Sequence, residues 1–354
     1  MKKIAVGIDF SKKTFDVTVV RREEDHFEEL GYCAFPNDTK GFRSFEKWVK
    51  TTLKTASEKA DKSSLIFCGE HTGTYSIELC DYLAEKGYFM WLESALVIHR
   101  KAGIIREKND RVDSKRIAHY ALCNFSDDVR AYERPSKEMK KLKSLISAHQ
   151  ILTKDKVTKI NQIKSGVLDD SSLALRMLKA ELDSIRKRLK EIDAAIRKLL
   201  AASEELSHNY EILISFKGVG SLTAAYLILK TLNFKYMTAP RELGCYIGVV
   251  PHGQQSGISI NKAPKTSRYR DSTANSLLST CALLSIYFNN EIIRPYYDRL
   301  IARGVMRQKA LNNCKFKIIN VLLAMIKNDK KFDITIHGKS KVQWLKEDSD
   351  KQTA

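Results

Sequence analysis

The chain has 354 residues, and a hydrophobic content of 43% with 9% aromatic residues is typical of a globular protein with two or three cores. Its 61 lysines and arginines exceed its 42 acidic residues, which gives a formal net charge of +19. No apolar run approaches the roughly 20 residues of a membrane-spanning helix, and the N-terminus enters a predicted strand rather than a signal peptide. We therefore expect a cytoplasmic protein that is neither secreted nor embedded in a membrane.

The net charge and the cysteines indicate the kind of partner and the kinds of site that the chain can have. A positive excess of this size is typical of proteins that bind a polyanion, although part of such charge can serve solubility alone. Nucleic acid is favoured over a membrane surface because no segment is both strongly amphipathic and anchored by Trp or Phe. The seven cysteines form no CxxC pair, which indicates reduced thiols and argues against a disulfide framework or a zinc site.

The first predicted element is a strand that carries a carboxylate at its end. Apolar residues alternate with small ones from Ile4 to Ile8, and Asp9 follows; period two over a short run predicts a strand. Residues 11–13 are predicted to turn into a second strand over 15–20, which makes a hairpin. Because Asp is a poor strand former, Asp9 is either a ligand for a divalent cation or a cap of the turn.

Strands and helices then alternate along the N-terminal third of the chain. The pattern predicts a third strand over 27–35, a helix over 40–56, a strand over 65–68, a helix over 76–86 and a strand over 88–92. Three antiparallel strands followed by α/β units form the order of an RNase H-like, or RuvC-like, mixed-sheet domain. The predicted fold class is therefore α/β plus α: an α/β domain at the N-terminus, followed by mostly helical structure.

Four acidic residues stand at the ends of these elements. Asp9 and Glu70 end the first and fourth strands, so their carboxylates converge if those strands are neighbours. Asp110 and Asp113 are three residues apart and share one face of a predicted helix. Four carboxylates suit one or two Mg²⁺ ions better than zinc, and such ions assist phosphodiester chemistry. The alternative for either helix acid is a cap at the helix N-terminus.

A basic run surrounds the last two acids. It comprises His99, Arg100, Lys101, Arg106, Lys108, Arg111, Lys115 and Arg116. Cations at this density suit a phosphate backbone, and a solvated face is the alternative. We expect contacts to nucleic acid from Arg100, Lys101, Arg106 and Arg111.

Heptads dominate the middle of the chain. A lysine-rich helix precedes a second helix from Ser172 to about Ala202. In the second helix the two apolar positions of four successive heptads are filled by Leu175, Leu182, Leu189 and Ile196 and by Leu178, Ile185, Ile192 and Leu199. This repeat predicts a coiled-coil arm. Its partner is either the preceding helix or another subunit.

Glycines mark the start of the C-terminal domain. Gly218 and Gly220 lie between two apolar helical segments, which resembles a helix-hairpin-helix turn whose backbone N–H groups hold a phosphate. The alternative is a tight turn between helices that needs glycine. Helices are predicted over 274–287 and 311–326.

Residues 243–257 are predicted to include a loop marked by proline and glycine, and Ser256 lies in it. A serine among basic residues is a candidate nucleophile towards phosphate, although a loop serine is more often a turn residue. The basic residues that follow it are Lys262, Lys265, Arg268 and Arg270. We expect the first three to contact nucleic acid.

Six segments, taken in order, resemble the insertion-sequence transposases of family 110. They are GIDFSKKTFDV, GEHTG, KNDRVDSKRIAHY, FKGVGSLTAAYLI, YIGVVPHGQQSG and QKALNNCKFKIINVLLAMI. The resemblance covers the chain from Lys3 to about Phe332 and implies the DEDD type. It divides the chain into a RuvC-like domain (1–130), the coiled-coil arm (131–205), a mostly helical C-terminal transposase domain (206–335) and a polar tail (336–354).

The resemblance also implies residue roles and partners. Asp9, Glu70, Asp110 and Asp113 match the family's Mg²⁺-binding acids, and Ser256 matches the serine that forms a phosphoserine link to DNA. A bridge RNA from the element would pair with donor and target DNA. The protein would assemble as dimers and a tetramer, with each active site built from two subunits.

The match has one departure, and two other functions compete with it. Family members often carry a Lys-Arg-Gly turn and a later arginine after the serine. Here the segment KAPKTSRYRDSTANSLL has no glycine and has Asn275 near the position of that arginine.

One competing function is a RuvC-like nuclease that uses activated water, for which Ser256→Ala is nearly harmless. The other is a non-catalytic nucleic-acid-binding scaffold, whose binding weakens steeply with salt.

Overall fold

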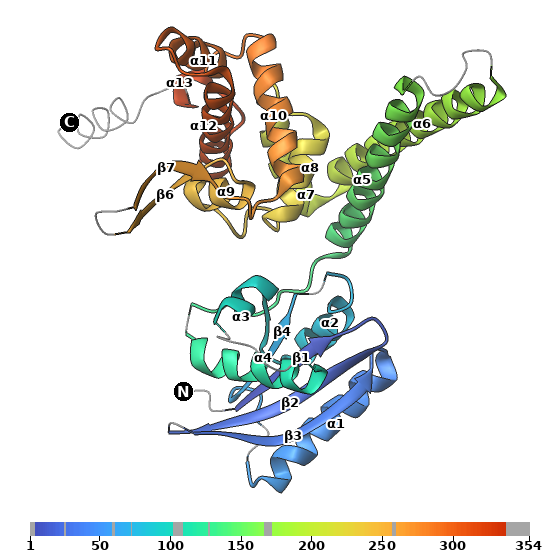
Figure 1. Cartoon of the computed structure of the whole chain (residues 1–354), viewed down its shortest axis with the longest axis vertical. Helices are drawn as coiled ribbons and strands as arrows, with labels where there is room; N and C mark the ends of the chain where they lie inside the picture. Colours follow the sequence, from blue (N-terminus) through green and yellow to red (C-terminus); the bar gives the residue numbers. More distant parts are fainter. Residues whose placement is uncertain are drawn as a thin grey trace. The chain divides into compact units, whose positions relative to one another are not determined.

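A computed structural model describes residues 4–24, 26–58, 61–71, 73–101, 109–126, 128–165, 172–256 and 260–337. The chain divides into two compact units, Met1–Arg134 and Pro135–Ala354 (Figure 1). We describe each unit by itself. None of the helices in the described ranges is both long and apolar enough to cross a membrane.

The first unit is built on a mixed five-stranded sheet. Its strands are β1 (Ile4–Phe10), β2 (Thr14–Glu23), β3 (His26–Pro36), β4 (Leu65–Glu70) and β5 (Met90–Glu93), and their order is β3-β2-β1-β4-β5. The first three strands are antiparallel neighbours, whereas β4 and β5 run parallel to β1. The sequence prediction is confirmed in this respect, because the sheet is mixed and its first and fourth strands are neighbours.

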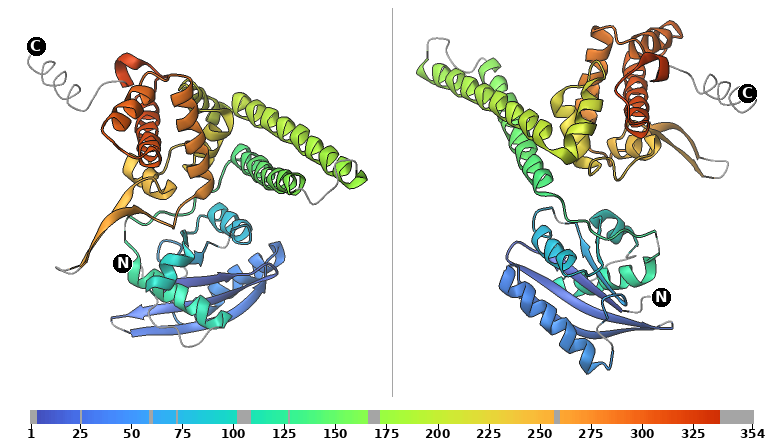
Figure 2. Two further views of the ribbon diagram at one scale, coloured as in Figure 1. Left: turned by 45° about the horizontal axis from the view of Figure 1, so that its top comes forward. Right: turned by 180° about the vertical axis from the view of Figure 1, so that it is seen from behind.

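Two helices lie on each face of the sheet. Alternate side chains of the strands pack against α1 (Thr39–Thr55) and α2 (Ile77–Glu85) in one core. The opposite face packs against α3 (Ala95–Lys101) and α4 (Asp110–Asn124) in a second core. Figures 1 and 2 show α1 and α4 on opposite sides of the sheet. Successive strand residues point to opposite faces, so both cores follow from near-continuous apolar strands.

Helix α4 approaches β1 closely because residue 7 is glycine. A Cβ atom at Gly7 would lie 2.1 Å from the carbonyl oxygen of Ser114 and 2.4 Å from the amide nitrogen of Ala118. The hydroxyls of Thr18 on β2 and Ser114 also form a buried hydrogen bond of 2.7 Å. Asn109 caps the helix by accepting from the amide of Val112 at 2.8 Å. These contacts fix the first turns of α4 over the C-terminal end of β1.

The second unit begins with two long antiparallel helices. Helices α5 (Lys137–Lys164) and α6 (Leu173–Ala202) lie side by side (Figures 1 and 2). Ion pairs join Lys159 to Glu181 at 2.5 Å and His149 to Asp193 at 3.4 Å. Of the two pairings that the sequence left open, the structure contains the one within the chain. Supercoiling of the pair stays a prediction.

Helices form most of the rest of the second unit. They are α7 (Glu204–Ile214), α8 (Ser221–Lys230), α9 (Pro240–Ile247), α10 (Ser272–Tyr287), α11 (Ile293–Ala302), α12 (Arg307–Lys327) and α13 (Ile334–His337). One apolar core contains side chains from helices α7 through α10 and from α12, together with the adjoining ends of α5 and α6. The predicted helices over 274–287 and 311–326 correspond to α10 and α12.

The predicted loop before the serine is wrong in part. Residues 251–256 form strand β6 (Pro251–Ser256), which pairs antiparallel with β7 (Ile260–Thr266). The register shifts at Gly253, so this glycine marks a bulge rather than a loop. Pro251 is the first residue of its strand, a position where the missing N–H is tolerated.

Candidate active site

The strand register brings two of the predicted acids to one end of the sheet. In the parallel β1–β4 ladder Ile8 is opposite Gly69, so Asp9 and Glu70 are the next residues on neighbouring strands. Ala5 and Cys68 belong to the core beneath α4, and side chains two residues apart share a face. Asp9 and Glu70 therefore lie on the face that α4 covers.

The pKa of Asp9 indicates which other acids lie near it. Burial is the largest cause that raises the pKa of Asp9, from 3.8 to about 7. The negative charges of Asp113, Glu70, Asp110 and Asp16 follow, in that order. Like charges disfavour ionisation over short distances. Glu70, Asp110 and Asp113 therefore lie near enough to raise the pKa of Asp9, and we call these four predicted acids the acid group.

A fifth acid, Asp16, was missed by the sequence analysis. It lies directly opposite Asp9 in the β1–β2 ladder, and its side chain is buried. The hydroxyl of Tyr32 donates to its carboxylate at 2.5 Å, and this bond is the main cause that raises the pKa of Tyr32 to about 12. An aspartate within an apolar strand, two residues before Thr18, was the available signal.

Glu93 is a sixth acid near this end of the sheet. It pairs with Glu70 across β4 and β5. Its carboxylate accepts from the hydroxyl of Tyr120 at 2.9 Å and from the amide of Ser94 at 2.7 Å. Glu93 is not among the acids that raise the pKa of Asp9, so we do not count it in the acid group.

The acid group suits Mg²⁺ in its chemistry but is not arranged as a coordination shell. Carboxylate oxygens are the donors that hard cations prefer, and a cation would relieve the repulsion at Asp9. However, Asp113 forms an ion pair with Arg116. In the parts of the chain that the structure describes, no three His, Cys, Asp or Glu side chains lie close enough to hold a metal ion. Metal binding therefore requires side chains such as Asp113 to turn.

The predicted basic contacts of the first unit differ in how far they are engaged. Arg111 pairs with Glu29 at 2.6 Å and lies over the ring of Tyr32. Lys101 donates to Asn124 at 2.6 Å. Arg100 is exposed on α3, and Arg106 lies outside the described residues. Arg111 is therefore partly neutralised by Glu29, and the side chains of Arg100 and Lys101 are exposed.

Ser256 and its basic neighbours belong to the second unit. The backbone of Ser256 ends β6 opposite Ile260, and that of Lys262 lies in β7 opposite Gln254; their side chains lie outside the described part. Lys265 and Arg268 are exposed. Asn275 donates to the carbonyl oxygen of Ile247 at 3.0 Å. The residue that departs from the family pattern thus binds the C-terminal end of α9.

The glycines between α7 and α8 have different structural reasons. Gly218 has a φ of +115°, and a Cβ there would lie 2.1 Å from the hydroxyl of Ser285. This packing supports the alternative of a tight turn that needs glycine. Gly220 begins α8 without a side-chain cap, and a Cβ there would meet no atom of the described residues within 4 Å. A phosphate contact therefore stays a prediction, and Gly220 is the better placed of the two.

The mixed sheet with acids at the ends of β1 and β4 and at the start of α4 is compatible with a RuvC-like domain. The chain matches a DEDD-type IS110 family model, described as Transposase, over residues 6–173. It matches a second model, described as Transposase IS116/IS110/IS902 family, over residues 210–298. The chain belongs to the IS110 family of transposases and is therefore a DNA recombinase.

Similar proteins include relatives with named activities. A pilin gene-inverting protein of Moraxella bovis is 24% identical over 342 residues, which cover 95% of this chain and all of that protein. The protein of the same name from Moraxella lacunata is 23% identical with the same coverage. An uncharacterized 43.6 kDa protein of insertion element IS110 from Streptomyces coelicolor is 30% identical over 46% of this chain and 38% of its own length.

Proposed function

We propose that this chain recombines the DNA of an insertion sequence by serine attack with Mg²⁺-binding carboxylates, guided by a bridge RNA. Ser256 is the nucleophile, and the acid group (Asp9, Glu70, Asp110 and Asp113) holds the metal. The observation that carries the proposal is the β1–β4 register, which sets Asp9 and Glu70 on neighbouring strands at one sheet end. The raised pKa of Asp9, to which Asp113 and Asp110 contribute, supports it. Sites that bind a charged substrate or cation often show such perturbed groups.

The proposed covalent step exchanges one phosphodiester for another. The hydroxyl oxygen of Ser256 bonds to phosphorus, the bond from phosphorus to a deoxyribose oxygen breaks, and the serine proton leaves to a base. The freed strand end accepts a proton. In rejoining, a DNA hydroxyl attacks the phosphoserine and releases the serine, so no oxidant or energy source is consumed.

The residues of the acid group have a separate part in the proposal. Bound Mg²⁺ would neutralise charge on the scissile phosphate and orient it. Asp9 exchanges a proton near neutral pH, since its pKa is about 7. The group must therefore lose a proton when it gains a cation. Asp113 must exchange Arg116 for that cation.

The proposed partners are donor DNA, target DNA, the bridge RNA and further copies of this chain, as dimers and a tetramer. The net charge of +19 supports polyanionic partners. The name of the Moraxella relatives states that they invert a gene. Inversion needs two sites to be cut and rejoined, which favours recombination over simple cleavage. We propose that this recombination takes place in the cytoplasm of a prokaryote, on the nucleoid.

A covalent-trapping assay tests the proposal. Purified protein, RNA from the element, donor and target DNA and Mg²⁺ are mixed and denatured, and DNA is tested for attached protein. We expect an adduct with the parent and with Ser259→Ala, a control at the next serine along the chain. We expect none with Ser256→Ala or Asp9→Ala. Cleavage that persists in Ser256→Ala without an adduct would instead establish the water-activating nuclease.

A further inference from the structure

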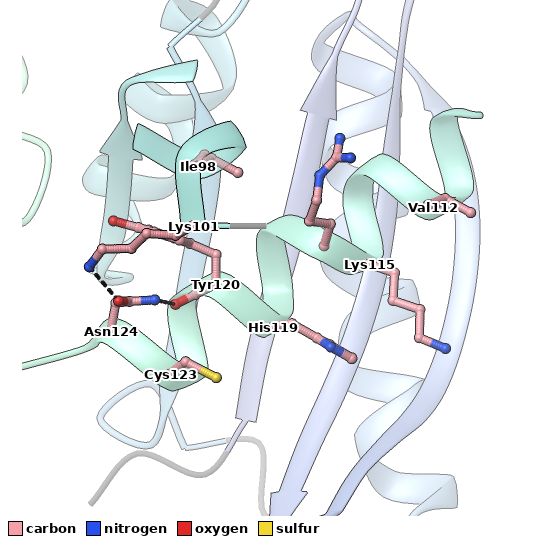
Figure 3. Close-up of a pocket in the computed structure, with 9 residues that line it drawn as sticks. Ile98, Lys101, Val112, Lys115, His119, Tyr120, Cys123 and Asn124 are labelled. Atoms are coloured by element: carbon pink, nitrogen blue, oxygen red, sulfur yellow. Dashed lines mark hydrogen bonds between the residues drawn. The ribbon is translucent and has the colours of Figure 1, made fainter. Parts of the chain in front are cut away.

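A cavity of about 350 Å³ lies along α4 beside α3, and no role above accounts for it (Figure 3). Figure 3 shows Lys115, His119 and Cys123 on successive turns along one side of α4. Lys101 and Ile98 of α3 also line it. A cavity of ~300–1,000 Å³ is the usual size for a small ligand, so this one can hold one unit of a larger molecule.

Nitrogen donors from two helices line the cavity. Lys115, Arg116 and His119 line it from α4 and Lys101 from α3; we call these four side chains the cationic edge, and none of the lining residues is acidic. Lys115 forms an ion pair with Glu29 at 3.0 Å, and Arg116 forms one with Asp113. These two acids lie outside the cavity lining and neutralise only part of its positive charge.

Two buried nitrogens at this edge lack a hydrogen-bond partner within the described ranges. They are Nε of Arg116 and Nε2 of His119. Buried polar groups are nearly always satisfied, so such an exception needs an explanation. Burial lowers the pKa of His119, and the charge of Lys115 lowers it further, while Glu29 opposes both. An anion bound here would supply the missing hydrogen-bond partner.

Apolar side chains also line the cavity. They are Ile98, Val112 and Tyr120, which we call the apolar wall, and the ammonium of Lys101 lies 5.8 Å from the centre of the Tyr120 ring. Tyr120 packs on Trp91 with ring centroids 5.2 Å apart, and its hydroxyl donates to Glu93. Cations beside a fixed aromatic ring are how sequence-tolerant sites hold single-stranded nucleic acid, because the phosphate meets the cations and the base meets the ring.

We propose that this cavity binds one nucleotide of a single-stranded nucleic acid, with its phosphate at the cationic edge and its base or sugar against the apolar wall. The inference deepens the proposed function and rests on it only in taking nucleic acid as the partner. DNA and RNA share this chemistry, and the experiment distinguishes them.

Cys123 provides a local probe, because it is exposed and lines the cavity. The full chain in EDTA is alkylated with iodoacetamide, with and without oligothymidylate or oligouridylate, and the rate at each cysteine is followed by mass spectrometry. We expect bound oligonucleotide to slow alkylation of Cys123 several-fold and to leave Cys33 of the same unit unchanged. Protection by only one of the two oligonucleotides identifies the strand as DNA or RNA.

A double substitution tests the cationic edge. Lys101→Gln with Lys115→Gln should weaken oligonucleotide binding roughly ten-fold and lower the slope of log K against log salt by about 1 to 2. Arg111 keeps Glu29 paired in that variant. The matched control is Lys47→Gln with Lys54→Gln, two lysines on α1 with the same change of net charge. We expect this control to bind as the parent does.

Two outcomes would overturn the inference. Oligonucleotides that bind without slowing Cys123 alkylation would place their site elsewhere. Inorganic polyphosphate that protects as well as an oligonucleotide would remove the role of the apolar wall. Neither reaction step nor metal enters this assay, so its result is independent of whether Ser256 forms an adduct.

Discussion

At the scale of single residues, ionisation of the Asp9 carboxyl lowers the stability of the folded chain. Its folded-state pKa of about 7 exceeds its ordinary value of 3.8, so between these values the folded chain holds a proton that the unfolded chain has released. Stability therefore falls as pH rises through this window and levels off above it. The carboxylate destabilises the apoprotein at pH 8 and is nearly neutral in effect below pH 4.

Asp9→Asn should remove this penalty. About three pKa units correspond to ~4 kcal/mol, and partial solvent exposure reduces this to roughly 1–2 kcal/mol. We expect the variant to exceed the parent in free energy of unfolding by that amount at pH 8, and to match it near pH 4, as measured by urea unfolding in EDTA. An equal pH dependence in parent and variant would show that the acid group does not burden the folded state.

Gly7 is required for a different reason, which is space. A Cβ at this position would overlap backbone atoms of α4 at 2.1 and 2.4 Å, and backbone cannot give way as a flexible side chain can. Gly7→Ala should therefore cost at least about 1–3 kcal/mol in urea unfolding, the range of an overpacked core. Gly253→Ala is the control, because a Cβ there meets no described atom within 4 Å. Equal losses in the two variants would contradict this account.

At the scale of elements, the first two turns of α4 carry opposite charges that interact. Its first turn supplies Asp110 and Asp113 to the acid group, and Arg116 one turn later pairs with Asp113. The same arginine lines the proposed nucleotide cavity. The helix therefore links the two proposed sites, since Arg116 can serve only one anion fully at a time.

Arg116→Gln should make the acid group bind Mg²⁺ more tightly. The substitution releases Asp113 and removes a positive charge beside the other carboxylates. We expect a larger rise of Tm on addition of Mg²⁺ than in the parent, together with a loss of about 1 kcal/mol without metal. Arg134→Gln removes an exposed arginine paired with Glu85 and serves as the control. A Tm response unchanged from the parent would show that the ion pair does not restrain the metal ligands.

Elements with clear periodicity could be predicted from the sequence, and contacts between elements could not. The strands of the first unit, α4 and α6 follow from alternation or heptads. The β6–β7 hairpin was missed because proline and glycine at 251 and 253 are loop residues in most contexts, and only pairing with β7 turns them into a strand start and a bulge. Asp16 was missed because its role depends on lying opposite Asp9.

At the scale of the whole molecule, the chemistry is divided between two cores. The acid group lies in the unit that ends at Arg134, and Ser256 lies in the unit that begins at Pro135. Each unit has its own buried clusters, and none of the clusters formed by described residues crosses this boundary. Positive charge suited to nucleic acid is likewise present in both, in the basic run over residues 99–116 and in the basic residues after Ser256.

This division predicts that residues 1–134 fold without the rest of the chain. The fragment retains both faces of the sheet covered by helices, so it should unfold cooperatively in urea, as small single domains do. It should keep the pH dependence that Asp9 confers and its loss in Asp9→Asn, while forming no DNA adduct. A fragment that expresses unfolded would mean that the second unit stabilises the sheet. A folded fragment without the Asp9 effect would mean that residues beyond Arg134 contribute to the raised pKa, contrary to the set of acids identified around it.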